Sequence, residues 1–323
     1  MKKVLLTTSA LTLLAGAAAA DVGLSGHARI GISNSTAAVS ATDTTKVGTV
    51  NYLRNQITFT GSATSDGGLT LSTWTRYRQS AASSVFAGTG AFSAPNISVS
   101  NGAITLAAGN TGGAVAMNAG IWGCGAIMWG CADIVGSWDW ASTSSTGAGP
   151  NVVRLDMALG SASVSVSGGN GNDSEVAMSL PLGGGSVGIG YDTGTATAAA
   201  AAVVASAGSF NADGTTTAGV EASAAVVAAD AKSTISINYS GTMGGLAVGV
   251  RTAQSDGKTG YMANVTAPLG GGSVYVFAGK TMQGGNNYGL RYNQSLGGSV
   301  AMQAGVTSAG GTTTVGAGVN FSF

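Results

Sequence analysis

The last segment of the chain alternates strictly between apolar and small polar residues. One set of positions holds Val315, Ala317, Val319, Phe321 and Phe323, and the other holds Thr314, Gly316, Gly318, Asn320 and Ser322. A period of two is typical of a β-strand whose two faces meet different surroundings. A soluble sandwich can alternate in this way, but it rarely does so up to an aromatic final residue. The segment therefore predicts a strand with one apolar face and one wet face.

The first twenty residues have the pattern of a secretory signal. Lys2 and Lys3 form a basic start, residues 4–14 are apolar, and residues 18–20 are small alanines that suit a cleavage site. We expect 1–20 to be a signal peptide and the mature chain to begin at Asp21. Beyond this leader the sequence has no apolar run of about eighteen residues, so it predicts no transmembrane helix. Only a closed β-barrel could then cross a membrane.

Segments of about ten residues with the same alternation recur along the chain, bounded by Gly, Asn, Asp or Ser. Their number is sixteen, and single-chain bacterial barrels have an even number of strands. We predict an all-β protein with one domain over 21–323, a transmembrane antiparallel β-barrel of sixteen strands. The predicted strands lie near 22–33, 50–62, 69–79, 95–101, 102–110, 151–160, 161–168, 174–182, 185–193, 232–241, 245–253, 259–268, 272–282, 286–296, 298–308 and 311–323.

The connections between these segments alternate in length. Every second one is short, and most of these are rich in glycine, which is typical of periplasmic turns. The heptapeptide Pro-Leu-Gly-Gly-Gly-Ser-Val occurs at 181–187 and again at 268–274, each time between two predicted strands. The intervening connections include 34–49, 80–94, 110–150 and 194–231, which we expect to be extracellular or folded inward. The Ala-rich segment 194–231 is interpreted as a long surface loop.

Composition and motifs exclude several classes of function. Charged residues make up 8% of the chain, and removal of the leader leaves a small excess of acidic ones, so no nucleic-acid partner is expected. Gly257-Lys258-Thr259 and Gly279-Lys280-Thr281 lack the first glycine of a phosphate-binding loop. One histidine and two cysteines cannot supply a four-ligand zinc site without carboxylates. We expect no enzyme activity, no cofactor and no metal.

Basic residues of the first three predicted strands share one face. Apolar residues such as Leu24, Ile57 and Leu71 occupy the opposite face of the same strands. An arginine facing lipid costs about 2 to 4 kcal/mol at the bilayer midplane, so the basic face must point into the lumen. The predicted basic wall of the pore consists of His27, Arg29, Arg54, Arg76 and Arg78. Such a wall creates a local preference for anions, although each arginine could also be an ordinary solvated side chain.

The lipid side of these strands also carries Asn55, Thr73 and Thr75. Polar groups are disfavoured there unless another protein surface covers them. This pattern predicts that the first strands face a subunit interface.

Segment 110–150 contains a near-duplication, Ile-Trp-Gly-Cys at 121–124 and Met-Trp-Gly-Cys at 128–131. An oxidising periplasm favours a disulfide between Cys124 and Cys131, with a pair of reduced thiols as the alternative. The segment also carries Trp122, Trp129, Asp133, Trp138 and Asp139. On an exposed loop these tryptophans would present a large apolar patch to water, which folding the segment into the lumen would relieve.

Together these features resemble the general bacterial porins, particularly those of alphaproteobacteria. The resemblance rests on the leader followed by residues 21–29, on Ile-Thr-Leu-Ala-Ala-Gly-Asn-Thr-Gly-Gly at 104–113, and on the ending 318–323. It implies a homotrimer of sixteen-stranded barrels in the outer membrane. It also implies that 110–150 is a constriction loop opposite the basic wall, and that Phe323 is an aromatic end recognised during assembly. This loop is less acidic than is usual in the family.

The hypothesis from sequence is a water-filled channel for passive diffusion of small hydrophilic solutes and ions, weakly preferring anions. A structural or adhesive surface protein is the alternative, because similar compositions occur in β-solenoids. The two heptapeptides lie too far apart to be a solenoid repeat. A barrel hydrolase that uses His27 with Ser25 is a second alternative, for which no acidic partner is identifiable.

Overall fold

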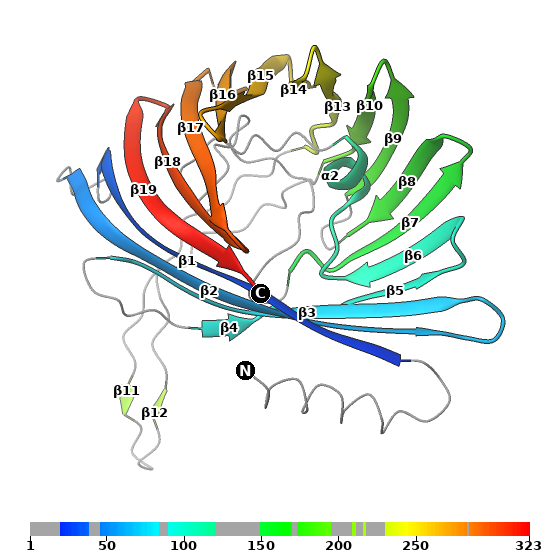
Figure 1. Cartoon of the computed structure of the whole chain (residues 1–323). Coiled ribbons are helices and arrows are strands. Elements are labelled where there is room, and N and C mark those ends of the chain that lie inside the picture. The colour runs from blue at the N-terminus through cyan, green and yellow to red at the C-terminus, as the bar shows by residue number, and fades with distance from the viewer. Residues whose placement is uncertain are drawn as a thin grey trace.

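The protein folds into one ring of antiparallel strands with a short helix inside it (Figure 1). The structure is a computed structural model that describes residues 20–38, 46–83, 90–119, 149–169, 173–194, 209–210, 216–217, 230–282 and 284–323. Neighbouring strands of the ring follow each other in chain order. The strand β1 pairs with both β2 and β19, which closes the sheet.

All sixteen predicted strands are present. The sheet has one further short strand, β4, which pairs with β3 beside β5 and shares its place in the ring. The ring therefore has sixteen strand positions. The bounds are β1 Ala20–Ala38, β2 Lys46–Thr64, β3 Thr70–Ser83, β4 Gly90–Phe92, β5 Asn96–Ser100, β6 Ile104–Gly109, β7 Val152–Leu159, β8 Ala162–Gly168, β9 Ser174–Leu182, β10 Gly185–Asp192, β13 Thr234–Met243, β14 Leu246–Ser255, β15 Lys258–Leu269, β16 Gly272–Lys280, β17 Asn286–Gly297, β18 Val300–Ala309 and β19 Thr312–Ser322.

Three elements are not part of the barrel wall. The strands β11 (Ser209–Phe210) and β12 (Thr216–Thr217) form a separate two-stranded sheet within the predicted loop 194–231. The helix α2 (Ala114–Asn118) belongs to the predicted constriction segment. No helix among the described residues is long and apolar enough to cross a membrane.

The repeated heptapeptide forms the same turn twice. Gly183 and Gly184 connect β9 to β10, and Gly270 and Gly271 connect β15 to β16. All four have positive φ angles, between 53° and 82°. Two-residue hairpin turns that match the twist of the strands require positive φ at both central positions, which glycine adopts without steric cost.

The first two strands are longer than the sequence predicts. Segment 34–49 was expected to be a long loop, but β1 continues to Ala38 and β2 begins at Lys46. The polar residues after Ile32 remain paired with β2, and the Thr36 hydroxyl accepts a 2.8 Å hydrogen bond from the Thr313 N–H of β19. Backbone pairing thus extends past the apolar part of these strands.

Large apolar side chains cover the outside of the barrel. Val22 is 73% exposed, Leu24 is 64% exposed and Ile32 is 56% exposed, and similar residues recur on every long strand. An apolar band of this extent would not be stable in water, whereas lipid is a suitable surrounding. The buried apolar cluster is small and lies inside the ring, where Val115 and its neighbours on α2 belong to the same cluster as Met262 and Phe277.

We predict that Gly271→Val lowers the stability of the barrel, whereas Gly271→Asn has a smaller effect. No atom lies within 4 Å of a Cβ added at Gly271, so the cost is conformational, about 1 to 2 kcal/mol at positive φ. Asparagine tolerates this region better than valine. The urea midpoint for unfolding from lipid vesicles measures the difference.

The matched control is Gly67→Val, because Gly67 also lies in a short turn but is not among the glycines with positive φ. Its midpoint should stay close to wild type. Equal midpoints for the two Gly271 variants would contradict the turn assignment.

Candidate pore wall and anchored segment

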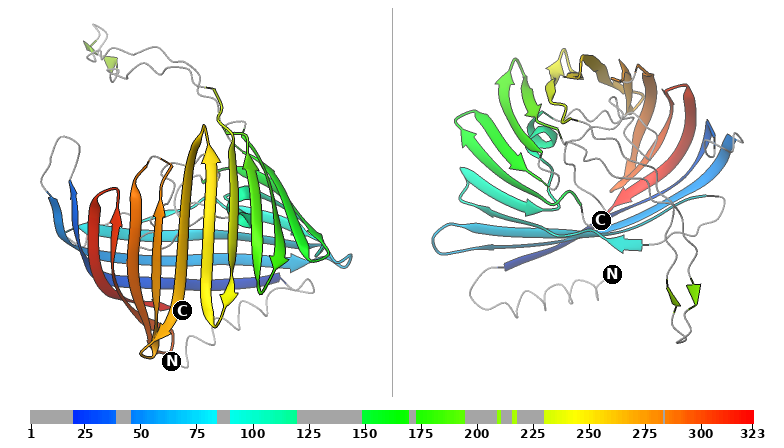
Figure 2. Two further views of the ribbon diagram at one scale, coloured as in Figure 1. Left: turned by 90° about the horizontal axis from the view of Figure 1, so that it is seen from above. Right: turned by 180° about the vertical axis from the view of Figure 1, so that it is seen from behind.

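The helix α2 identifies the inner face of the barrel. Figures 1 and 2 both place it within the ring, and the side chains of Ser165 and Glu175 hydrogen-bond to it. Residues directly opposite each other in antiparallel strands point to the same face. The inner face can be followed from β8 to β1 through cross-strand partners, because each partner faces the same way as the residue opposite it. These partners are Ser165–Asp156, Asp156–Thr105, Thr105–Ser100, Ser100–Thr70, Thr70–Thr64 and Ser62–Asp21. Even-numbered residues of β2 and β3 and odd-numbered residues of β1 therefore face inward.

All five residues of the predicted basic wall lie on this inner face. His27 is opposite Gln56, which is opposite Arg78 on its other side. In the next row Arg29 is opposite Arg54. Arg76 belongs to the neighbouring row, opposite Thr58. The strands β1, β2 and β3 thus bring the five together, and their role in permeation remains a proposal.

Aromatic side chains hold two of these arginines in place. The Arg76 guanidinium carbon lies 4.3 Å from the ring centroid of Trp74, and that of Arg54 lies 5.6 Å from Tyr52. Contacts of this kind contribute about 0.5 to 1 kcal/mol at exposed sites and leave the positive charge in place. These two arginines therefore keep their charge while their position is restrained.

Two further inward arginines were missed by the sequence analysis. Arg291 lies on β17, close enough to Arg29 for the two charges to repel each other. Arg251 lies on β14, and Tyr275 of β16 lies between the two, 5.2 Å from the Arg291 guanidinium. Arg251 and Arg291 obey the same period-two rule as the first three arginine-bearing strands. Applying that rule to every predicted strand would have found them.

The start of segment 110–150 is attached to the inner wall opposite the first strands. The strand β10 is equally far from β1 in both directions around the ring, and α2 packs against β8, β9 and β10. Glycines at 188 and 190 make room for it, because a Cβ at Gly190 would come within 3.0 Å of Val115 and Ala119. The helix therefore fits a hollow in the wall that only very small residues allow.

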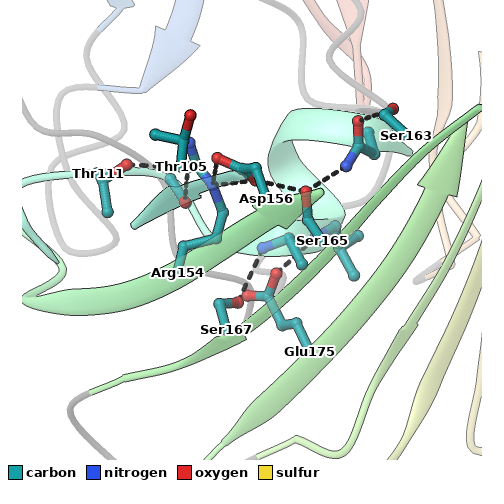
Figure 3. Close-up of polar contacts among 12 residues, drawn as sticks. Thr105, Thr111, Arg154, Asp156, Ser163, Ser165, Ser167 and Glu175 are labelled. Carbon is teal, nitrogen blue, oxygen red and sulfur yellow. Dashed lines mark hydrogen bonds and ion pairs between the residues drawn. The ribbon is translucent and has the colours of Figure 1, made fainter. Parts of the chain in front are cut away.

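Polar contacts from the two strands β8 and β9 bind α2 to the wall (Figure 3). The Ala114 N–H donates to the Ser167 hydroxyl at 2.8 Å, and the Val115 N–H donates to the Glu175 carboxylate at 2.7 Å. At the other end of the helix, the Asn118 amide donates to the Ser165 hydroxyl at 2.5 Å. The first turn and the end of α2 are thus both held by side chains of the barrel.

Arg154 of β7 anchors the residues that precede α2. Its Nη1 donates to the Thr111 hydroxyl at 2.8 Å and also to the Gly112 carbonyl. Its Nε forms a 2.8 Å ion pair with Asp156, and Ser165 donates to the same carboxylate (Figure 3). The charge of Asp156 is therefore neutralised within the wall.

Other predicted site residues lie outside the described part of the chain. They are Trp122, Cys124, Trp129, Cys131, Asp133, Trp138 and Asp139. The disulfide and the contribution of the tryptophans remain predictions. The signal peptide also falls there, except for Ala20, which begins β1.

Two of the three outward polar groups that predicted a subunit interface are hydrogen-bonded within the chain, and the interface itself stays a prediction. The Thr73 hydroxyl donates to the Asn96 carbonyl and the Thr75 hydroxyl to the Ser93 carbonyl, each at 2.8 Å. These threonines are satisfied within the chain, because the carbonyls of Ser93, between β4 and β5, and of Asn96, at the start of β5, lie next to β3. They give no reason to expect a covering subunit.

A closed barrel with apolar residues outside, charged residues inside and an inward segment is the architecture of outer-membrane channels. The closed ring also excludes the β-solenoid. The family profile of Gram-negative porins matches residues 7–317, so the chain belongs to that family. It is a channel protein of the bacterial outer membrane, which it crosses with many strands.

Solved structures support the same fold. A mutant of Rh. blastica porin with two introduced tryptophans matches with a TM-score of 0.68 and 15% identity, and another with an introduced lysine with 0.68 and 14%. A triple mutant of Rhodopseudomonas blastica porin gives 0.64 and 16%. Each match covers 94% of this chain and 100% of the other. A search of curated protein sequences finds no match.

We predict that Arg154→Met destabilises the barrel by about 3 kcal/mol, since it leaves a partly buried carboxylate without its partner. The double variant Arg154→Met with Asp156→Leu should recover part of this loss. Unfolding in urea, followed by heat-modifiable mobility in gels, measures both. If the loss of stability in the double variant equalled the sum of the losses in the two single variants, Arg154 and Asp156 would not act as a coupled pair.

Proposed function

We propose that the channel lets small hydrophilic solutes and ions diffuse passively and weakly prefers anions. The observation that carries this proposal is the distribution of charge on the inner face. Arginines on β1, β2, β3 and β17 line one side of the lumen, and Arg251 on β14 lies nearer the far side, two strand positions from β10. The carboxylates of β7, β9 and β10 lie on the far side, where Asp156 is paired with Arg154 and Glu175 is buried by α2.

The field of such a lumen acts across the path of a solute. Arginines near one another raise the local concentration of anions, and low-dielectric walls strengthen the effect. Screening by salt limits it, because the Debye length is about 10 Å at 0.1 M and about 3 Å at 1 M. The preference is therefore expected to weaken as the salt concentration rises.

The surroundings of His27 do not favour a hydrolase. Its charged neighbours are Arg29, Arg54, Arg76 and Arg78. Its Nε2 has no hydrogen-bond partner within the described ranges. A catalytic histidine paired with Ser25 would require a carboxylate to orient the ring. Passive transport is proposed without any catalytic step.

Segment 110–150 is proposed to narrow the lumen. Its first part, up to Ala119, is anchored inside the ring by Arg154, Ser167 and Glu175. This attachment places the start of the segment on the inner wall around β8 to β10. Solutes would then pass between the arginines and the segment.

We predict that chloride permeates more readily than potassium, measured as the reversal potential across a planar bilayer under a salt gradient. The triple variant Arg29→Gln, Arg54→Gln, Arg78→Gln should lower the permeability ratio by about twofold or more. Arg291→Gln alone should shift it in the same direction.

The matched control is Lys280→Gln, which removes one positive charge from the outer face at the exposed end of β16. Its reversal potential should remain at the wild-type value. Clear cation selectivity of the wild-type channel, or equal shifts from Arg291→Gln and Lys280→Gln, would refute the field argument.

We also propose that three copies of the chain associate through the outer face of β1 to β4. This face carries an aromatic group in which the Tyr77 and Phe92 ring centroids lie 5.2 Å apart and those of Phe59 and Phe92 6.2 Å apart. Next to it, Leu53, Asn55 and Phe321 line an outward cavity of about 490 Å³. Projecting rings and an adjacent hollow suit a heterologous contact, in which the rings of one copy enter the hollow of the next and the ring closes after three copies.

We predict that Asn55→Cys gives covalent trimers with a trifunctional maleimide in mild detergent, in a background in which Cys124 and Cys131 are replaced by serine. Ile237→Cys is the control, because it lies on the outer face of β13, equally far from β2 in both directions around the ring. Only monomers from both variants would count against the trimer.

A further inference from the structure

Three carboxylates meet on the inner wall where β9 and β10 reach the loop end of the barrel. Glu175 and Asp192 are directly opposite each other in these strands, and Asp173 precedes β9. One oxygen atom from each residue lies within 4.8 Å of those of the other two. Buried like charges at this separation repel strongly, so the cluster requires a cation or bound protons.

The three residues are almost completely removed from solvent. Asp173 is 8% exposed, Glu175 is 3% exposed and Asp192 is 2% exposed. Glu175 accepts a hydrogen bond from the Val115 N–H at 2.7 Å, and Asp192 accepts one from the Gly194 N–H at 2.5 Å. Neutral backbone donors of this kind do not cancel the charge of the cluster.

Asp173 provides an independent indication of a ligand. Its Oδ1 is buried and has no hydrogen-bond partner in the part of the chain that the structure describes. An unsatisfied buried carboxylate oxygen is rare, because losing water without a replacement is costly. The carboxylate that carries it belongs to the same cluster as those of Glu175 and Asp192.

We propose that Asp173, Glu175 and Asp192 bind one calcium ion. Calcium takes oxygen ligands at about 2.3 to 2.6 Å, so oxygens on opposite sides of the ion are up to about 5 Å apart. The separations in the cluster fit within this limit. Magnesium requires distances of about 2.0 to 2.1 Å and retains its water, and the cluster has no histidine or thiolate that would favour zinc.

The ion would strengthen the attachment of segment 110–150. Glu175 binds the Val115 N–H at the first turn of α2, and a Cβ on Gly113 would collide with its carboxylate. Fixing Glu175 by a metal ion therefore fixes the place where the chain enters the barrel. This inference does not depend on the proposed ion selectivity or on the trimer.

The test is a calorimetric titration of calcium chloride into the full-length protein in detergent, after treatment with a chelator and dialysis. We expect one ion per chain with a dissociation constant below about 1 mM, the range of extracellular calcium modules. Magnesium should bind at least tenfold more weakly. Asp173→Asn should weaken calcium binding at least tenfold, and Asp192→Asn should do the same.

Asp66→Asn is the matched control, because it removes one carboxylate from an exposed short turn, and it should keep the wild-type affinity. No binding of calcium by wild type, or equal affinity of wild type and Asp173→Asn, would overturn the proposal. If Asp173→Asn did not fold, the wild-type titration and Asp192→Asn would decide. Conductance of the chelated protein distinguishes failure of calcium binding from failure of the channel function, because the channel should still conduct without calcium.

Discussion

The structure depends on the need to pair every backbone N–H and C=O that lies in lipid. Unpaired groups cost several kcal/mol each where no water can reach them, so a sheet in the membrane must have no free edge. The seam between β1 and β19 meets this requirement. Phe323 extends it by exchanging two hydrogen bonds with Gly26, at 2.7 and 3.0 Å. Because the seam closes the ring, each strand has one face in lipid and one in the lumen.

The division of each strand into a lipid face and a lumen face determines where charged residues can lie. Residues with little affinity for lipid can only point inward, and small inner residues such as Gly289, Gly305 and Gly318 leave space beside the arginines. Positive charge collects around β1 to β3 and continues to Arg291. Opposite, the wall is occupied by α2 and the carboxylates beneath it. The lumen is therefore asymmetric: the wall that carries the arginines is open to the lumen, and the opposite wall is covered by α2.

Period-two alternation was sufficient to predict all sixteen strands, their order and the inward arginines of the first three. It did not predict α2, since a five-residue helix cannot form by itself and depends on the hollow at Gly188 and Gly190. The role of Arg154 was also hidden, because its partners at 111 and 112 are distant in sequence. Asn34 and Ser35 were interpreted as the start of a loop, yet continued pairing with β2 keeps them in a strand.

Reactivity of single cysteines in β1 tests the inner basic wall most directly. Ser25→Cys places a thiol on the inner face in the row of Thr58 and Arg76, and Ile30→Cys places one on the lipid face, both in a background without Cys124 and Cys131. Charged, membrane-impermeant thiol reagents should modify the first thiol and not the second, and the anionic reagent should react faster than the cationic one. Equal modification of both positions, or faster reaction of the cationic reagent at position 25, would contradict a lumen wall made basic by these arginines.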